Sequence, residues 1–472
     1  MFIGRARELD FLQERYDSER AELVVLYGRR RIGKTELLQQ FARDKAAVFY
    51  ACTECTDQEQ LARFSKRILQ TGLPAARFLT SFSDWETALR SIQDVPSEGK
   101  KLLIIDEFPY MCASRPELPS ILQNLWDHEL SRANVMLILC GSAMSFIENE
   151  LLAERNPLYG RATGIYKLLP LPFVSVREFF PHYSVEDQVA VYSILGGIPY
   201  YLIQFQSEKS LEENIRTNIL QKGCVLYNEV EFLLRQELRE TSVYNAIIEA
   251  VALGNNTLAL IHSKTQIEKT KISVYLKNLM EIGIIEREFS VLSTAKERAG
   301  SGRGLYQLTD AYFRFWYAFL YGSYSELEAG DVCGVWQHII APQLHEFVAH
   351  AFEKICVEHL RARNRAGTLP FHFIKVGRWW EKVTHVEDGK RRTVSEEIDI
   401  VAADRAERNF LLAECKFRHA PADLDVLRRL QEKFPQKKYP GNYHYMIFSF
   451  YGFTQRLQAA AARENVLLVA GI

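Results

Sequence analysis

Uninterrupted apolar runs mark the first third of the chain, at residues 23–27, 102–105 and 135–140. Because none of them alternates with polar residues, each run predicts a strand with both faces covered, as in a parallel sheet. Helical patterns lie between the runs, for example over residues 36–43 and 116–130. Alternating strands and helices predict an α/β fold with a doubly wound parallel sheet, in which a ligand lies at the carboxyl ends of the strands.

The loop after the first apolar run has the sequence Gly28-Arg29-Arg30-Arg31-Ile32-Gly33-Lys34-Thr35. It fits G-x-x-x-x-G-K-[ST] and joins a predicted strand to a helix that begins at Glu36, which is the setting of a phosphate-binding loop. Backbone N–H groups and the helix N-terminus bind phosphate in such a loop. We therefore expect ATP here, with Lys34 on the β- and γ-phosphates and Thr35 as a ligand of Mg²⁺.

Polar residues follow the other two apolar runs. Asp106 and Glu107 end the second run, and Ser142 comes shortly after the third. At the carboxyl end of a strand, Asp106 is expected to hold Mg²⁺, and Glu107 to orient or deprotonate the attacking water. Ser142 is expected to hydrogen-bond the γ-phosphate or that water. The alternative for Asp106 and Glu107 is a solvated strand end that binds no ligand. The alternative for the Gly-Ser pair that ends at Ser142 is an ordinary turn, and both alternatives stay open.

Composition narrows the class of protein. The chain has 472 residues with 47% hydrophobic and 25% charged residues, which is typical of a soluble protein of about three domains. The net charge of −1 excludes a global basic field for nucleic acid. No apolar run approaches the roughly 18 residues of a membrane helix. Of eight cysteines only Cys52 and Cys55 are close in sequence. With no second pair at zinc spacing, this pair is expected to be incidental, with a metal or redox site as the alternative, and a cytoplasmic protein is expected.

The middle of the chain is mostly helical. Between residues 242 and 308 the order is helix, short helix, helix and hairpin, which predicts a winged helix-turn-helix. The third helix, over residues 269–282, carries an apolar stripe opposite several lysines. A glycine-rich loop at residues 299–304 would be the wing. Contact with DNA and a purely internal regulatory role are both open. The aromatic-dense residues 310–324 are expected to pack between domains.

A second set of chemical residues lies near the C-terminus. A helix over residues 341–360 contains Glu353, and two strands joined by a tight turn contain Asp399, Glu414 and Lys416. Alternate residues of a strand point to the same side, so Glu414 and Lys416 share one face, and Asp399 can join them from the neighbouring strand. We expect Asp399 and Glu414 to bind Mg²⁺ and Lys416 to activate water. The alternative is that these acids only form salt bridges and bind no metal.

This order of elements resembles the PD-(D/E)xK nuclease fold, and the resemblance implies that Glu353 is a helix-borne acid beside the metal. The following helix, over residues 424–434, presents Arg428, Arg429 and Lys433 as a basic face for a DNA backbone.

Three further motifs resemble those of the archaeal-type ATPase family, a branch of the STAND NTPases found in archaea and bacteria. They are Phe2-Ile3-Gly4-Arg5 with Glu8-Leu9, Pro157-Leu158-Tyr159-Gly160-Arg161, and Gly196-Gly197-Ile198-Pro199. The resemblance implies that Ile3 and Arg5 lie near adenine, that Arg161 is a γ-phosphate sensor or arginine finger, and that Pro199 belongs to a lid that senses the nucleotide. A surface ion pair for Arg161 and a simple helix end at Pro199 are the alternatives. Many members carry a C-terminal domain of unknown function, the DUF234 type.

The sequence therefore predicts a P-loop ATPase core over residues 1–185, a helical lid over 186–240, a winged helix over 241–310, an aromatic-rich connector over 311–340 and a nuclease-like α/β domain over 341–472. The expected function is an ATP-hydrolysing switch that binds DNA and controls the nuclease-like domain. The alternative is a signalling scaffold with an inactive nuclease-like domain, and a DNA motor is a third hypothesis. No membrane partner is expected, and assembly into a homo-oligomer stays open.

Overall fold

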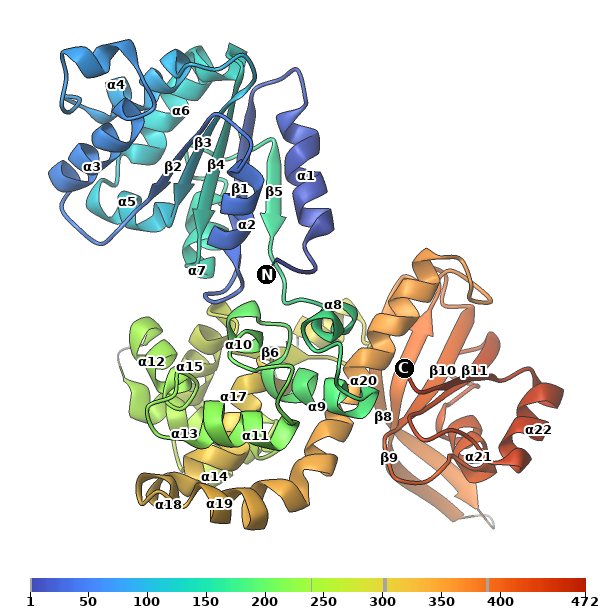
Figure 1. The fold of residues 1–472 in the computed structure, drawn as a ribbon. Helices are drawn as coiled ribbons and strands as arrows, with labels where there is room; N and C mark the ends of the chain where they lie inside the picture. The colour runs from blue at the N-terminus through green and yellow to red at the C-terminus, as the bar shows by residue number, and fades with distance from the viewer. Residues whose placement is uncertain (1, 239, 300–303, 388–389) are drawn as a thin grey trace. The chain divides into compact units, whose positions relative to one another are not determined.

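The computed structural model describes residues 2–238, 240–299, 304–387 and 390–472 (Figure 1). The chain divides into two compact units. The N-terminal unit comprises Met1–Leu171 with two short segments, Ile198–Tyr201 and Glu281–Gly283, and the C-terminal unit comprises the rest of the chain. The finer five-part division stays a prediction.

The N-terminal unit is built on a five-stranded sheet in which every neighbouring pair of strands is parallel, in the order β2-β3-β4-β1-β5. The predicted α/β fold with a parallel sheet is confirmed. One strand, β4, separates β1 from β3, so the loop after β1 and the acids that end β3 face each other across the end of β4. The strands are β1 (Glu22–Tyr27), β2 (Ala47–Ala51), β3 (Lys101–Asp106), β4 (Val135–Gly141) and β5 (Gly164–Lys167).

Helices cover both faces of this sheet (Figure 1). They are α1 (Ala6–Tyr16), α2 (Lys34–Ala42), α3 (Asp57–Leu69), α4 (Trp85–Arg90), α5 (Phe108–Ser114), α6 (Leu118–His128), α7 (Met144–Phe146) and the π-helical η4 (Ile147–Leu151).

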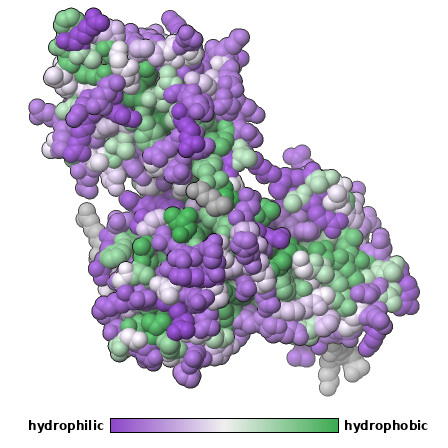
Figure 2. All heavy atoms as spheres, in the orientation of Figure 1, coloured by the Kyte–Doolittle hydropathy of each residue, from purple (hydrophilic) through white to green (hydrophobic). Residues whose placement is uncertain are grey.

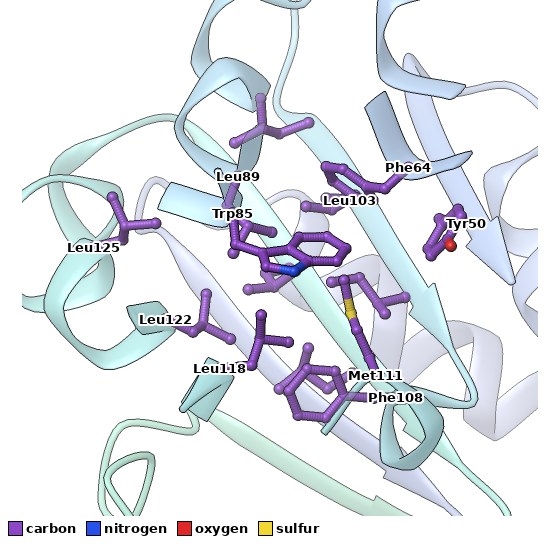
Figure 3. Packing of buried hydrophobic residues seen from close by; sticks show 14 of the residues in the cluster. Tyr50, Phe64, Trp85, Leu89, Leu103, Phe108, Met111, Leu118, Leu122 and Leu125 are labelled. Carbon is purple, nitrogen blue, oxygen red and sulfur yellow. The ribbon is translucent and has the colours of Figure 1, made fainter. Parts of the chain in front are cut away.

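The core of the N-terminal unit lies between the sheet and helices α3 to α6. Figure 3 shows the Trp85 ring at its centre, and the indole N–H donates to Asp57 Oδ1 at 2.7 Å. Burying large apolar side chains on both sheet faces fixes the strand ends, because each buried strand residue resists displacement. The labelled members of this cluster are Tyr50, Phe64, Trp85, Leu89, Leu103, Phe108, Met111, Leu118, Leu122 and Leu125.

The first half of the C-terminal unit is helical. Helix α10 (Pro199–Leu202) belongs to the N-terminal unit up to Tyr201. The elements of the C-terminal unit here are α8 (Phe173–Phe179), α9 (Val185–Leu195), α11 (Leu211–Ile215), η5 (Arg216–Leu220), α12 (Glu229–Glu237), α13 (Thr241–Ala252), α14 (Leu258–Thr265), α15 (Lys269–Glu281), β6 (Ile285–Glu288), α16 (Ala295–Ala299), β7 (Leu305–Leu308), α17 (Ala311–Phe315), η6 (Trp316–Leu320), η7 (Tyr321–Ser323), α18 (Tyr324–Glu328), α19 (Val332–Gly334) and η8 (Val335–Ile340).

The region predicted as a winged helix has three helices, α13 to α15, followed by the antiparallel hairpin β6–β7. The apolar stripe of α15 is buried, as its spacing predicts: Ile272, Leu276 and Leu279 have no exposed surface. Most of the predicted wing, residues 300–303, lies outside the described residues.

The aromatic stretch after this hairpin serves packing. Tyr312 and Trp316 are fully buried, and they donate hydrogen bonds to the backbone carbonyls of Leu226 at 2.6 Å and Tyr227 at 3.0 Å. These bonds satisfy the polar ends of both rings, as buried Tyr and Trp require.

A second five-stranded sheet, in the order β12-β11-β10-β9-β8, forms a separate C-terminal layer. β8, β9 and β10 are antiparallel neighbours, whereas β10, β11 and β12 are parallel. Apolar residues of α20 pack on one face, and those of α21 pack on the other. The elements are α20 (Ala341–Arg365), β8 (Lys375–Glu387), β9 (Lys390–Ala403), β10 (Asn409–Lys416), α21 (Leu424–Lys433), β11 (Asn442–Ser449), α22 (Gln455–Glu464) and β12 (Leu467–Ala470).

Two earlier segments of the chain contribute to the core of this C-terminal sheet. Phe173 and Val189 pack in one cluster with α20, and Val291 and Leu292 pack in another with Trp379 of β8. Val291 also donates its backbone N–H to the carbonyl of residue 378 at 2.9 Å. The C-terminal sheet therefore does not close its core with residues 341–472 alone.

Among the described residues, none of the helices is both long enough and apolar enough to cross a membrane. The face of the N-terminal unit shown in Figure 2 is dominated by hydrophilic residues.

Candidate functional site

The loop between β1 and α2 is held by close packing and by unusual backbone angles. A Cβ on Gly28 would lie 2.6 Å from the carbonyl oxygen of Leu168, so only glycine fits there. Gly33 and Arg31 have positive φ, 89° and 70°. A left-handed backbone is costly for a residue such as Arg31, and such strain persists where the surroundings fix it, often at functional sites. Ile32 anchors the loop because it is buried.

Lys34 is buried at the base of this loop. Its ammonium donates to the carbonyls of Gly28 at 3.0 Å and Arg29 at 3.1 Å. An ammonium has three N–H donors. The lysine is thus folded over the loop where phosphate oxygens would lie, and the residues present fit a nucleotide triphosphate. Glu36 follows as an exposed acid in the first turn of α2.

A chain of hydrogen bonds joins this loop to the ends of β3 and β4. Thr35 Oγ1 donates to Asp106 Oδ2 at 2.6 Å, and the Glu107 N–H donates to Asp106 Oδ1 at 3.0 Å. Ser142 donates to Glu107 Oε2 through its N–H at 3.0 Å and its hydroxyl at 2.9 Å. The structure therefore brings together all four residues that the sequence predicts here. Hydroxyl and carboxylate oxygens are the donors that Mg²⁺ prefers, so Thr35 and Asp106 fit this ion.

Glu107 has a left-handed backbone with φ of 54° at the start of α5. The turn directs its carboxylate back toward Ser142 rather than along the helix. Among the described residues of this unit, Arg31 and Glu107 are the two non-glycine residues with positive φ, and both lie in the nucleotide site. The backbone of the site is thus held in a strained form by its surroundings.

Arg5 acts on the loop from the N-terminal motif. Its guanidinium donates to the carbonyls of Ile32 at 3.0 Å and Leu169 at 2.8 Å, and it pairs with Glu8 at 3.1 Å. Burial lowers the pKa of Arg5. These bonds make Arg5 a residue that positions the loop backbone. Ile3 is partly buried, and its predicted place near adenine stays a prediction.

The Gly-Ile-Pro segment reaches the same loop. The Pro199 ring lies 3.6 Å from the position that a Cβ on Gly33 would occupy. Next to it, the Arg31 guanidinium lies 4.1 Å from the centre of the Tyr200 ring. Arg30 donates to the Tyr110 hydroxyl at 3.2 Å. Two of the three successive arginines of the loop therefore contact aromatic side chains.

Arg161 forms an ion pair, which is the alternative that the sequence left open. Its guanidinium makes a two-pronged ion pair with Asp127 of α6, at 2.9 Å and 2.7 Å. It also donates to the carbonyl of Pro157 at 2.8 Å. The structure does not join Arg161 to the loop by any of these contacts, and its role as a sensor or arginine finger stays a prediction.

The C-terminal acids converge at neighbouring strands. Asp399 on β9 accepts a hydrogen bond from the Cys415 N–H of β10 at 2.8 Å. Lys416 Nζ lies 2.5 Å from Glu414 Oε2 and 3.9 Å from Asp399 Oδ2. The period-2 alternation of β10 thus places Glu414 and Lys416 together, as the sequence predicts.

Lys433 joins this group from α21, which the sequence analysis missed. Its Nζ lies 2.6 Å from Glu414 Oε1, so both carboxylate oxygens of Glu414 contact an ammonium. Lys433 therefore does not belong to the predicted outer basic face, whereas Arg428 is exposed and pairs with Glu464 at 2.6 Å, and contact of this face with DNA stays a prediction. The spacing of Lys433 from the buried Val426 and Leu430, seven and three positions earlier, is the helical period that marks an inward face.

The acidic site, as we name Glu353, Asp399, Glu414, Lys416 and Lys433, has strongly shifted carboxyls. Burial, followed by the charge of Asp399, raises the pKa of Glu353 to about 8. Burial and the charge of Glu414 raise the pKa of Asp399. Burial also acts on Glu414, but Lys416 and Lys433 outweigh it and lower its pKa. Converging buried carboxylates fit a divalent cation, because a cation would relieve their mutual repulsion.

The fold and the nucleotide site define a P-loop ATPase. Residues 2–205 match the model of an ATPase domain predominantly from Archaea, and residues 316–429 match that of archaeal and bacterial proteins of unknown function. Over 445 residues the chain is 31% identical to the uncharacterized protein MJECL04 of Methanocaldococcus jannaschii, with 93% of each chain covered. The chain therefore belongs to the family of archaeal-type ATPases with this C-terminal domain.

Two further similarities agree with this assignment. A segment of 45 residues, 10% of this chain, is 47% identical to 76% of the uncharacterized ATP-binding protein MJ0423 of the same archaeon. The Walker-type ATPase PABY2304 of Pyrococcus abyssi superposes with a TM-score of 0.52 at 20% identity, over 67% of this chain and 96% of that one. At this identity the second similarity shows the fold alone.

Proposed function

We propose that this ATPase is a switch in which bound ATP controls metal-dependent cleavage of DNA by the acidic site. The observation that carries the proposal is the convergence of Asp399, Glu414 and Lys416 on two neighbouring strands. Two carboxylates beside a lysine are the minimum equipment for hydrolysis of a phosphodiester with a divalent cation. The order of helix, antiparallel strands, helix and parallel strand agrees with a PD-(D/E)xK fold.

At the nucleotide site, Lys34 and the loop N–H groups would bind the phosphates, and Thr35 and Asp106 would hold Mg²⁺, which neutralises phosphate charge when bound. Glu107, held by Ser142, would orient the attacking water. Because Thr35, Asp106, Glu107 and Ser142 form one hydrogen-bonded chain, replacing any contact with a phosphate contact would change the others. Such an exchange would give the site two arrangements, with and without the γ-phosphate.

At the acidic site, Lys416 would release Glu414 when a cation takes that carboxylate, and its ammonium would then be positioned to orient water or stabilise the phosphate. A bound Mg²⁺ or Mn²⁺ supplies Lewis acidity and a lowered pKa of water. Glu353, with its pKa raised by burial and the Asp399 charge, would be a neutral donor until a cation binds. The exposed Lys269 and Lys271 of α15 support DNA contact by a winged helix.

The second candidate is a signalling scaffold in which the acidic site only binds. One observation favours it: both oxygens of Glu414 are already held by lysines, so a cation must displace an ammonium. A site that serves only as a salt-bridge cluster would look like this.

The two candidates are separated by a nicking assay with supercoiled plasmid and single-stranded DNA, with Mg²⁺ or Mn²⁺, with and without ATP. The test variant is Asp399→Asn, and the matched control is Asp425→Asn, an exposed aspartate of α21. We expect ATP-dependent cleavage by the parent and the control, with loss in Asp399→Asn at an unchanged ATPase rate. Cleavage that persists in Asp399→Asn refutes this active site, and no cleavage by any protein supports the scaffold.

A further inference from the structure

A second group of metal-binding side chains lies outside both sites. Glu186 at the start of α9, His345 near the start of α20 and His419 in the segment after β10 each offer one ligand atom, and these atoms lie within 4.8 Å of one another. The two imidazole rings are stacked, with centroids 3.9 Å apart and planes 24° from parallel. Three segments that are far apart in the sequence therefore bring two imidazoles and one carboxylate within reach of one ion, and one of the stacked rings must turn for both nitrogen lone pairs to meet it.

His345 has an unsatisfied ring nitrogen. Its Nε2 is buried and has no hydrogen-bond partner within the part of the chain that the structure describes. A buried polar atom without a partner costs free energy, so such an atom in a native protein requires an explanation. The neighbouring carboxylate and imidazole make a bound cation the explanation that fits, because a metal would take up that lone pair.

Tyr451 supports the carboxylate from outside. Its hydroxyl donates to Glu186 Oε1 at 2.6 Å, and its ring centre lies 4.9 Å from that of His419. Hydrogen bonds of this kind orient a ligating carboxylate and are typical of the shell around a metal site. The bond engages one oxygen of Glu186 and leaves the other for a metal.

We propose that Glu186, His345 and His419 form a binding site for a divalent transition metal of the Zn²⁺ class. Imidazole nitrogens with one carboxylate suit Zn²⁺, whereas Mg²⁺ and Ca²⁺ require oxygen ligands, so this site differs in chemistry from the acidic site. Three protein ligands leave the fourth position of a tetrahedral ion for water or a further ligand. His419 is exposed, so an ion can enter from solvent.

The proposed metal would connect three parts of the C-terminal unit. It would tie α9 and α20 to the segment that follows β10, only three residues beyond Lys416 of the acidic site. Metal binding would thus restrain the end of the strand that carries Glu414 and Lys416. The proposal does not depend on cleavage by the acidic site.

The test is calorimetric titration of Zn²⁺ into the full-length protein after chelator treatment, with Co²⁺ absorption as a second readout of coordination. Besides any ion held by the acidic site, we expect one ion per chain that is lost in the double variant His345→Ala/His419→Ala and is bound with 10–100-fold weaker affinity in Tyr451→Phe. If the double variant does not fold, Glu186→Gln provides a second test, because its amide oxygen can still accept the hydrogen bond from Tyr451. This variant is expected to lose the Co²⁺ spectrum. Asp399→Asn is expected to bind Zn²⁺ as the parent does.

The competing zinc ligands are Cys52 and Cys55. Burial raises the pKa of the Cys52 thiol, which disfavours the thiolate that zinc requires. We expect Cys52→Ser/Cys55→Ser to retain binding. Zinc binding that is lost in this variant and kept in the histidine variants overturns the proposal, as does a parent protein that binds neither Zn²⁺ nor Co²⁺.

Discussion

The nucleotide site and the acidic site both bring carboxylates together from neighbouring elements, but different partners hold them. Asp106 accepts from a neutral hydroxyl and a backbone N–H, and Glu107 accepts from the N–H and hydroxyl of Ser142. Glu414 instead lies between two lysine ammoniums. Neutral donors can be exchanged for phosphate or metal contacts at small electrostatic cost, whereas breaking an ion pair at a buried carboxylate is expensive.

Backbone geometry thus holds the nucleotide site in place, whereas ion pairs hold the side chains of the acidic site. Loop geometry, left-handed residues and close packing fix the first before any ligand binds. In the second, any cation must compete with Lys416 and Lys433. We expect substitutions to act on catalysis in the N-terminal unit and on ion affinity and pH response in the C-terminal unit.

The largest expected effect is that of Lys34→Ala. Loss of the ammonium removes a charge from the phosphate-binding loop, and we expect ATP turnover to fall by a factor on the order of 10²–10³ or more. Phosphate release from purified protein measures it, with Lys66→Ala on the exposed side of α3 as the matched control. An undiminished rate in Lys34→Ala would show that this loop does not serve ATP hydrolysis, and the contrast between the nucleotide site and the acidic site would then not hold.

Glu107→Gln is expected to separate binding from hydrolysis. The amide can still accept the bonds from Ser142 but cannot act as a base, so kcat should fall by about 100-fold while the Kd for ATP stays the same. Stopped-flow nucleotide binding and steady-state turnover measure the two quantities. A variant that loses affinity and turnover in parallel would show that Glu107 serves ground-state binding instead.

The C-terminal unit should be the pH-sensitive one, through His350 of α20. Burial, with the charges of Arg314, Lys354 and Arg378, lowers the pKa of His350 to about 3. Above the usual histidine pKa of about 6.5 the ring is neutral in both states and contributes nothing. As the pH falls below that value only the unfolded chain binds the proton, so the free energy of unfolding decreases until about pH 3.

At pH 5 this difference corresponds to about 2 kcal/mol, from 1.36 kcal/mol for each pH unit below about 6.5. Urea unfolding at pH 8 and pH 5 measures it for the parent and for His350→Gln, with His128→Gln of the N-terminal unit as control. We expect the change in the free energy of unfolding from pH 8 to pH 5 to be about 2 kcal/mol more favourable in the variant than in the parent and the control, whatever Glu353 adds in all three. Equal losses in all three would place the pH response elsewhere.

The smallest effect concerns the two lysines on Glu414. Lys433→Met removes one competitor for a cation, so we expect Mn²⁺ to bind about tenfold more tightly, equivalent to about 1.4 kcal/mol. Calorimetry or the paramagnetic spectrum of free Mn²⁺ measures the Kd. Lys437→Met, an exposed lysine just beyond α21, should leave affinity unchanged. Unchanged affinity in both variants would mean that the acids serve salt bridges only.

The sequence predicts those parts of the sites whose residues follow one another directly along the chain. β1, its loop and α2 follow one another directly, so the phosphate-binding loop could be found from spacing alone, and the alternation of β10 sufficed for Glu414 and Lys416. The group of Glu186, His345 and His419 could not be found, because tertiary packing brings it together from three segments. The partner of Arg161 depends on where the end of α6 lies, which no local pattern encodes.

The element that packs against the predicted lid also could not be predicted from the sequence. The helical pattern of the predicted lid, residues 186–240, indicates apolar faces but not the elements against which they pack. The structure packs Val189 with α20, and Glu358 of α20 accepts hydrogen bonds from the Phe173 N–H at 2.8 Å and the Tyr192 hydroxyl at 2.6 Å. Only the assembled core identifies the partner of an amphipathic helix.

The core that Phe173, Val291 and Leu292 share with the C-terminal sheet has a consequence for how such proteins can evolve and be engineered. A segment cut at residue 341 would leave behind apolar residues that close both faces of its sheet, and the exposed remainder would favour aggregation. For the same reason, recombination that moves the C-terminal sheet between ATPases would have to carry the helices before it, and grafting experiments should begin near residue 172.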